Sequence, residues 1–78
     1  MKKIELQGRF MDFCESNGID KEKYFLNYTS TRSGIFAVIM KHNPSGSISF
    51  AGNGEFYDYG ALAAWMDGYT AAKRNLYF

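Results

Sequence analysis

The chain has 78 residues and a formal net charge of +1, from nine basic and eight acidic side chains. At this length it forms one domain, residues 1–78, which buries only about 60% of the surface that its unfolded form exposes. A single cysteine, Cys14, excludes an internal disulfide, and a single histidine, His42, excludes a Cys/His metal cluster. Since aromatic residues make up 18% of the chain, aromatic packing is favoured over self-association as the source of stability.

Acidic and basic residues alternate along the chain, most clearly in residues 20–23 (Asp-Lys-Glu-Lys). Without a basic run, we expect no dedicated binding of nucleic acid. Residues 1–6 begin with lysines but lack the apolar region of about 7–15 residues of a signal peptide, and no apolar run approaches the roughly 20 residues of a membrane span. Because an unpaired cysteine is typical of a reducing compartment, we expect a cytoplasmic protein with no membrane association.

The first predicted element is a helix from Lys3 to Asn17. Its apolar residues recur at the spacing of a helix that packs one face on a core: Leu6, Phe10, Phe13 and Cys14. Asn17-Gly18 favours a left-handed end to this helix. A short second helix of one or two turns is predicted from Asp20 to Leu26, because Asp20 is a good N-cap. A strand that begins at Tyr24 is the alternative for this segment.

Three strand-like segments follow, separated by turn residues at 33–34 and 42–46. Residues 27–31 are polar and β-prone, which favours an edge strand. Residues 35–40 are continuously apolar, which is typical of a strand covered on both faces. Residues 47–51 alternate polar and apolar, which predicts a half-buried strand with Ile48 and Phe50 facing the core. The last two runs should form an antiparallel hairpin.

The last predicted element is an amphipathic helix that follows Asp58, its expected N-cap, and continues to Arg74. Its apolar face comprises Leu62, Trp65, Met66, Tyr69 and Ala72. A second stripe holds small residues that would lie against the sheet or against a second subunit: Ala61, Ala64, Gly68 and Ala71. The predicted fold is therefore α+β: a small antiparallel sheet of two or three strands, with an N-terminal helix, a short second helix and a C-terminal amphipathic helix packed on one face.

Candidate catalytic residues are few, and each has a structural explanation. Cys14 could be a nucleophile with His42 as its base, but Cys14 lies on the apolar stripe of the first helix, where a buried thiol is expected. Gly52-Asn53-Gly54 lacks the third glycine of a phosphate-binding turn, because Tyr57 stands at that position. Glu55 and Asp58 could form an acid–base pair or bind a hard metal ion, but Asp58 is needed as the helix cap. We therefore expect no enzyme, no cofactor and no metal site.

Six tyrosines are many for this length, and tyrosine is enriched in protein interfaces. Tyr57 and Tyr59 follow the glycine-rich loop and are harder to bury than the others. With Glu55 and Asp58 they form the predicted protein-binding surface. Stacking of nucleic-acid bases on the same rings is the alternative, although basic side chains are missing beside them.

Two segments resemble small accessory proteins encoded by bacteriophages. These proteins carry an early helix of the form Phe-x-x-Phe/Trp that ends near Asn-Gly, here residues 10–18, and end with Ala-Trp-x-x-Gly-Tyr/Trp-x-Ala-Ala-Lys/Arg, here residues 64–73. Proteins of this kind with one small domain and no catalytic residues include anti-CRISPR inhibitors. The resemblance implies stoichiometric binding to a host protein complex, such as a CRISPR–Cas effector, in the cytoplasm of the host cell. It assigns no residue a role.

We therefore predict a non-enzymatic protein-binding inhibitor of a host defence complex, which occludes a functional surface such as one that binds nucleic acid. A small nucleic-acid-binding module that uses tyrosine stacking is the alternative. A homodimer packed through the stripe of small residues is compatible with the first hypothesis.

Overall fold

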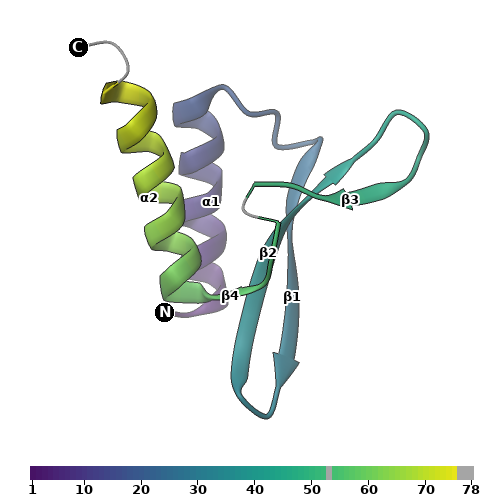
Figure 1. The fold of residues 1–78 in the computed structure, drawn as a ribbon, viewed down its shortest axis with the longest axis vertical. Coiled ribbons are helices and arrows are strands. Elements are labelled where there is room, and N and C mark those ends of the chain that lie inside the picture. The colour runs from purple at the N-terminus through teal and green to yellow at the C-terminus, as the bar shows by residue number, and fades with distance from the viewer. Residues whose placement is uncertain (53, 76–78) are drawn as a thin grey trace.

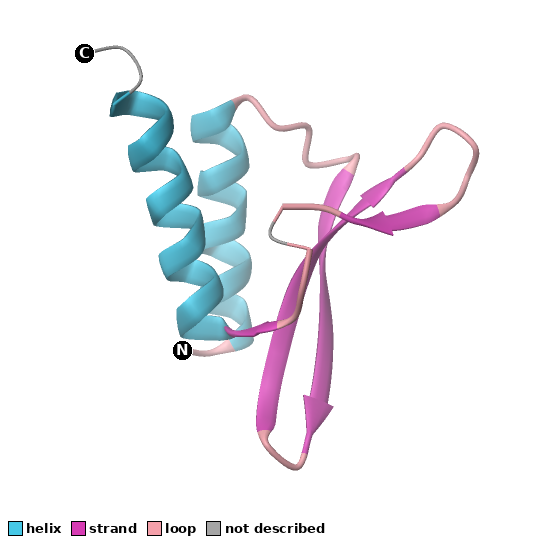
Figure 2. Ribbon diagram, viewed as in Figure 1, coloured by secondary structure: helices cyan, strands magenta, loops and turns pink. Residues whose placement is uncertain are grey.

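The computed structural model describes residues 1–52 and 54–75 as a two-layer fold of helices and strands (Figure 1). In chain order the elements are α1 (Lys3–Asn17), β1 (Tyr24–Thr31), β2 (Gly34–His42), β3 (Ile48–Phe50), β4 (Tyr57–Asp58) and α2 (Tyr59–Asn75). The two helices lie side by side and cover one face of an antiparallel sheet (Figure 2). The predicted α+β class is confirmed. Within those residues, neither helix is long and apolar enough to span a bilayer.

The segment between α1 and β1 holds one hydrogen-bonded turn and not the predicted short helix. The N–H groups of Lys23 and Tyr24 donate to the carbonyl oxygen of Asp20 at 3.0 and 3.1 Å, and Asp20 Oδ1 accepts the N–H of Glu22 at 2.9 Å. Asp20 starts the turn as a helix cap would. The turn then ends because Tyr24 and the residues after it pair with β2. The alternative, a strand that begins at Tyr24, is confirmed.

The sheet is organised around β2. One edge of β2 pairs with β1 over eight residues, from Tyr24↔Lys41 to Thr31↔Gly34. The other edge pairs with β3 near its end, at Met40↔Phe50, and with β4 farther back. The predicted hairpin of the two apolar runs is thus confirmed as β2–β3, and the predicted edge strand is part of the longer β1.

The core lies between the helices and the inner face of the sheet. Strand β2 contributes Ala37 and Ile39, which are 0% and 3% exposed. The apolar stripe predicted for α1 is confirmed, because all four of its residues are buried: Leu6, Phe10, Phe13 and Cys14. Helix α2 contributes Leu62, Ala63 and Met66, while Trp65 is half-buried and Tyr69 is 43% exposed.

The outer face of the sheet holds the alternate residues of β2. Val38 and Met40 point away from the helices, because successive side chains of a strand point to opposite faces. Val38 is nevertheless fully buried, whereas its outward neighbours Phe36 and Met40 are half-buried. The prediction that this strand is covered on both faces therefore holds at its centre, residues 37–39.

Ile48 and Phe50 face away from the core, so their predicted orientation was wrong. They pair with His42 and Met40, and residues that are paired across strands share a face of the sheet. Met40 is directed outward because its neighbour Ile39 is directed inward. As a result Ile48 is 53% exposed and Phe50 is 56% exposed. An alternating sequence shows that a strand has two unlike faces, but the register with its neighbour decides which face meets the helices.

The stripe of small residues on α2 lies on the surface. All four of its members are exposed: Ala61, Ala64, Gly68 and Ala71. The predicted alternative in which the stripe lies against the sheet was therefore wrong, because Leu62, Ala63 and Met66 take that position. The alternative, packing against a second subunit, stays a prediction.

A buried polar link joins the C-terminal ends of the two helices. Asn17 is 8% exposed, and its Nδ2 donates to the carbonyl oxygen of Phe13 and to Thr70 Oγ1, both at 2.9 Å. Thr70 Oγ1 donates in turn to the carbonyl oxygen of Met66 at 3.1 Å. Lys73 Nζ donates to the carbonyl oxygen of Asn17 at 3.0 Å. The chain then turns at Gly18, whose φ of +65° is the left-handed conformation predicted for the helix end.

Replacing Asn17 by Ala should lower the free energy of unfolding by about 1–3 kcal/mol, because the half-buried Thr70 hydroxyl and the Phe13 carbonyl each lose the hydrogen bond from Asn17 Nδ2. Urea titration followed by circular dichroism measures this change. The exposed neighbour Ser16 is the control, and Ser16→Ala should stay within about 0.5 kcal/mol of the wild type. Equal stabilities of the two variants would contradict a structural role for the link.

Candidate protein-binding site

The four residues of the predicted surface differ in exposure, so they do not form one common surface. Glu55 is exposed in the loop before β4. Tyr57 is half-buried against the core, since it pairs with Ala37 and shares its inward face. Asp58 Oδ1 accepts the N–H of Ala61 at 2.8 Å, which confirms Asp58 as the N-cap of α2. Tyr59 is only 6% exposed.

Tyr59 is thus a core residue and not an available surface anchor, contrary to the expectation that it is hard to bury. As the first residue of α2, it packs edge-on against Tyr28, with ring centroids 5.9 Å apart. Burial, and after it the neighbouring Tyr59, raise the pKa of the Tyr28 hydroxyl. That hydroxyl donates to Gln7 Oε1 at 2.7 Å. The glycine-rich loop lets the chain turn back to the core before the helix starts, and this brings Tyr59 inside.

Two exposed phenylalanines lie on the outer face of the sheet. Phe50 is 56% exposed, and Phe56 is 38% exposed. Their rings meet edge to face at a centroid distance of 6.2 Å and an angle of 82°. We call these two residues and Ile48 the outer patch. The sequence does not predict this patch, because its pattern places Phe50 in the core and gives no signal for Phe56.

The turn between β2 and β3 holds the outer patch in place. The N–H of Asn43 donates to the carbonyl oxygen of Ser47 at 2.9 Å, and the N–H of Gly46 donates to the carbonyl oxygen of Asn43 at 2.9 Å. The side-chain Nδ2 of Asn43 also donates to Ser49 Oγ at 3.1 Å, on the face opposite Phe50. A side chain that bridges both ends of the turn fixes β3 relative to β2. Two of the three patch residues, Ile48 and Phe50, are therefore carried by an ordered hairpin.

The outer face of the sheet also carries apolar and aromatic side chains between the outer patch and β1. Phe25 and His42 stack there with ring centroids 4.7 Å apart and an angle of 29°. His42 is exposed, but it is the last residue of β2 and not part of the turn, where the sequence placed it. Together with the half-buried Met40, this pair extends the apolar character of the outer face beyond the patch.

Cys14 and His42 do not form a nucleophile–base pair. Cys14 is fully buried in the core on the helix side of the sheet, whereas His42 lies on the outer face. Burial raises the pKa of the Cys14 thiol, and the positive charge of Lys21 lowers it by less. The thiol is therefore protonated at neutral pH and shielded from solvent, which is the structural role expected for it.

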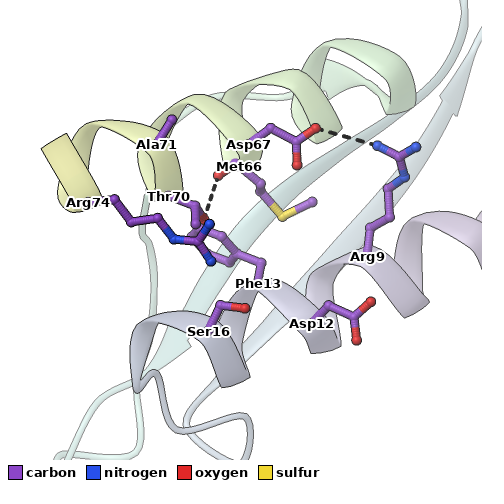
Figure 3. Close-up of a pocket in the computed structure, with 9 residues that line it drawn as sticks. All are labelled: Arg9, Asp12, Phe13, Ser16, Met66, Asp67, Thr70, Ala71 and Arg74. Carbon is purple, nitrogen blue, oxygen red and sulfur yellow. Dashed lines mark hydrogen bonds and ion pairs between the residues drawn. The ribbon is translucent and has the colours of Figure 1, made fainter.

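A shallow groove of about 360 Å³ runs between α1 and α2, and Figure 3 shows the side chains that line it. Arg9 Nη1 lies 3.6 Å from Asp67 Oδ2 across the groove, and both side chains are more than half exposed. Such an exposed ion pair contributes about 0–1 kcal/mol. With Asp12 and Arg74 the lining has two positive and two negative charges, so it has no net preference for an anion or a cation. In the part of the chain that the structure describes, no three His, Cys, Asp or Glu side chains are grouped to hold a metal ion.

A smaller apolar cavity of about 210 Å³ lies between the helices and the loop after β3. Three rings that line it pack together, Phe13, Trp65 and Tyr69, with centroids 5.4–6.1 Å apart. Gly52 borders the cavity with a φ of +63°, and a Cβ there would lie 3.0 Å from Ile39 Cδ1. The loop approaches the core this closely because Gly52 has no side chain. Asn53, the middle residue of the predicted glycine-rich turn, lies outside the described residues.

No protein-family model, curated protein or solved structure matches this chain. The class that the coordinates themselves define is a small α+β domain with two helices on one face of its sheet and an apolar patch on the other.

The Cys14 thiol should be inert toward a thiol reagent such as 5,5′-dithiobis(2-nitrobenzoic acid) in the folded protein at pH 7–8. Reaction should follow the unfolded fraction as urea is added, because the thiol is reached only when the core opens. Fast stoichiometric reaction without denaturant would contradict the buried position of Cys14.

The free energy of unfolding should fall as the solution becomes alkaline. The pKa of the Cys14 thiol is raised in the fold above its ordinary value of 9.0. The stabilisation of the neutral thiol is complete below about pH 9.0 and is lost as pH rises through the raised folded pKa. Urea titrations between pH 7 and pH 11 measure the loss. Cys14→Ala should show a shallower decline, and the same slope in both proteins would contradict this assignment.

Proposed function

We propose that this protein is a non-enzymatic inhibitor that binds another protein and covers a functional surface on it. The observation that carries the proposal is the outer patch: two phenylalanine rings and an isoleucine that are exposed on the outer face of the sheet, with the two rings in contact. Contiguous exposed apolar side chains on a small domain mark interaction sites. Aromatic side chains at the centre of an interface supply much of its binding energy.

The size of the domain suits a stoichiometric interface. A stable complex buries about 800 Å² on each partner, and each aromatic side chain buries about 150–250 Å² when fully covered. Phe50 and Phe56 would therefore form the centre of such an interface, and the flanking Ile48 and His42 would extend it. The ordered β2–β3 hairpin keeps the loss of conformational freedom on binding small.

Acidic side chains beside the patch indicate the chemistry of the partner. Glu55 is exposed and adjacent to Phe56, and Asp58 is exposed while one of its oxygens caps α2. These carboxylates would pair with basic residues that otherwise bind nucleic acid. This arrangement supports the anti-CRISPR version of the proposal, in which the partner is a CRISPR–Cas effector in the host cytoplasm.

Base stacking on Phe50 and Phe56 is the alternative that the same patch raises. Aromatic platforms bind single strands when positive side chains accompany them. Here the nearest charged neighbour in the chain is Glu55, so binding of another protein is the better-supported proposal. A labelled single strand that bound at low salt, with affinity falling steeply as salt rises, would favour the alternative.

Phe50→Ser and Phe56→Ser should each abolish inhibition while leaving the melting temperature within a few degrees of the wild type, because the removed rings support little of the core. The assay is plasmid interference in a host strain that carries a CRISPR–Cas system, with the protein expressed in trans. Ile4→Ser is the matched control, because Ile4 is 79% exposed on α1, away from the sheet. It should keep full inhibition.

Unchanged interference by the wild-type protein, against every CRISPR subtype tested, would remove the anti-CRISPR version of the proposal. Inhibition that survives both phenylalanine substitutions would remove the outer patch as the binding surface.

A further inference from the structure

Strand β1 presents a free edge from Leu26 to Ser30. Within residues 1–52 and 54–75 it pairs with β2 alone. The N–H of His42 donates to the carbonyl oxygen of Lys23 at 2.9 Å, one step beyond the pair Tyr24↔Lys41. Hydrogen-bonded and non-hydrogen-bonded pairs alternate in an antiparallel ladder, so the odd-numbered residues of β1 direct their backbone groups to β2. The even-numbered residues direct theirs away from the sheet. The N–H of Tyr24 donates to the carbonyl oxygen of Asp20, which leaves Leu26, Tyr28 and Ser30 to form the free edge.

This edge lacks the features that protect edge strands from further pairing. Proteins shield exposed edges with charged side chains, proline, bulges or very short strands. The eight residues of β1 contain no charge, no proline and no glycine, and their pairing with β2 is continuous. The opposite edge is different, because β3 has only three residues. The short β3 therefore protects its edge of the sheet from further pairing, whereas the edge at β1 can still pair.

We propose that β1 accepts an extended segment of the partner protein as an additional strand of the sheet. Leu26, Tyr28 and Ser30 each offer an outward N–H and an outward C=O, which together can form about six backbone hydrogen bonds. The proposal rests on the proposed protein-binding function and adds a second contact to it. The outer patch lies on β3 and in the loop before β4, across β2 from this edge, so each contact can be tested with its own variants.

The position of α1 favours an extended segment over a second copy of this chain. Helix α1 lies above β1, because Gln7 accepts the Tyr28 hydroxyl at 2.7 Å and Lys3 Nζ lies 4.3 Å from the Tyr28 ring centroid. Paired strands are about 4.7–4.9 Å apart, whereas packed helices need about 8–10 Å between their axes. Two copies paired through β1 would crowd their α1 helices on one face of the joined sheet. A segment without an overlying helix has no such conflict.

The positive charge of Lys3 indicates which side chains the bound segment should carry. The Lys3 ammonium group is exposed beside Tyr28, at the middle of the free edge. An acidic side chain opposite Tyr28 on the inner face would meet it, while β1 itself presents no charge to repel the segment. The expected ligand is therefore an extended segment with β-branched or aromatic residues at alternate positions and one Asp or Glu near its centre.

The first test is amide hydrogen exchange of the free protein followed by NMR. The outward N–H of Tyr28 should exchange about a hundredfold or more faster than those of Asn27 and Thr29, which bond to β2. Equal protection of all three in the free monomer would overturn the proposal. Protection of Tyr28 that rises with protein concentration would also overturn it, because a second copy would then occupy the edge.

The second test selects binders from a yeast-displayed library of random ten-residue peptides. Enriched peptides should protect the Leu26 and Tyr28 amides. Ser30→Pro should weaken binding by about tenfold or more, because it removes an outward N–H that β2 does not use. Lys3→Glu should weaken binding of acidic peptides by about three- to tenfold, and it keeps the fold because a negative charge suits the first turn of α1.

Phe50→Ser separates this inference from the proposed function. It should leave peptide binding unchanged, even though it removes inhibition. Peptide binding that is lost in Phe50→Ser but kept in Ser30→Pro and Lys3→Glu would place the binder on the outer patch and overturn the role of β1. Failure to enrich any peptide that distinguishes the wild type from both edge variants would overturn it too.

Discussion

The register of the β1–β2 hairpin is the constraint on which the rest of the structure depends. It directs Ala37 and Ile39 toward the helices and Met40 toward the outer face. Strands β3 and β4 inherit these directions because each pairs with β2. A shift by one residue would expose the inner side chains and bury the outer ones. The position of every aromatic residue on the sheet therefore follows from this one pairing.

Aromatic side chains of the domain lie on both sides of the sheet, buried in the core on one side and exposed on the other. On the helix side, Phe10 and Phe13 lie in the core, and the hydrogen bond from Asn17 to Thr70 joins the C-terminal ends of the two helices. On the other side, Phe50 and Phe56 contact each other but stay accessible. A chain this short has little core to spare, so exposed rings are a feature that stability alone does not explain. This is why the outer face, and not the helix groove, carries the functional proposal.

The structural features that the sequence predicted correctly are those that depend on residues close together in the chain. Both long helices, the cap at Asp58 and the left-handed Gly18 follow from residues that are neighbours in the chain. The orientation of Phe50 could not be predicted, because it depends on pairing with Met40 ten residues away.

Long-range contacts also decided the position of Tyr59 and the link between the helices. Tyr59 is buried against Tyr28, and Asn17 bonds to a residue 53 positions later. The most direct test of the two-faced sheet is the relaxation caused by a soluble gadolinium chelate, measured on the isoleucine methyl groups by NMR. We expect strong relaxation of the Ile48 methyl groups and protection of those of Ile39, because Ile48 is exposed on the outer face and Ile39 is buried in the core. Equal protection of the two would show that the outer face is covered or that the register differs, and would contradict this expectation.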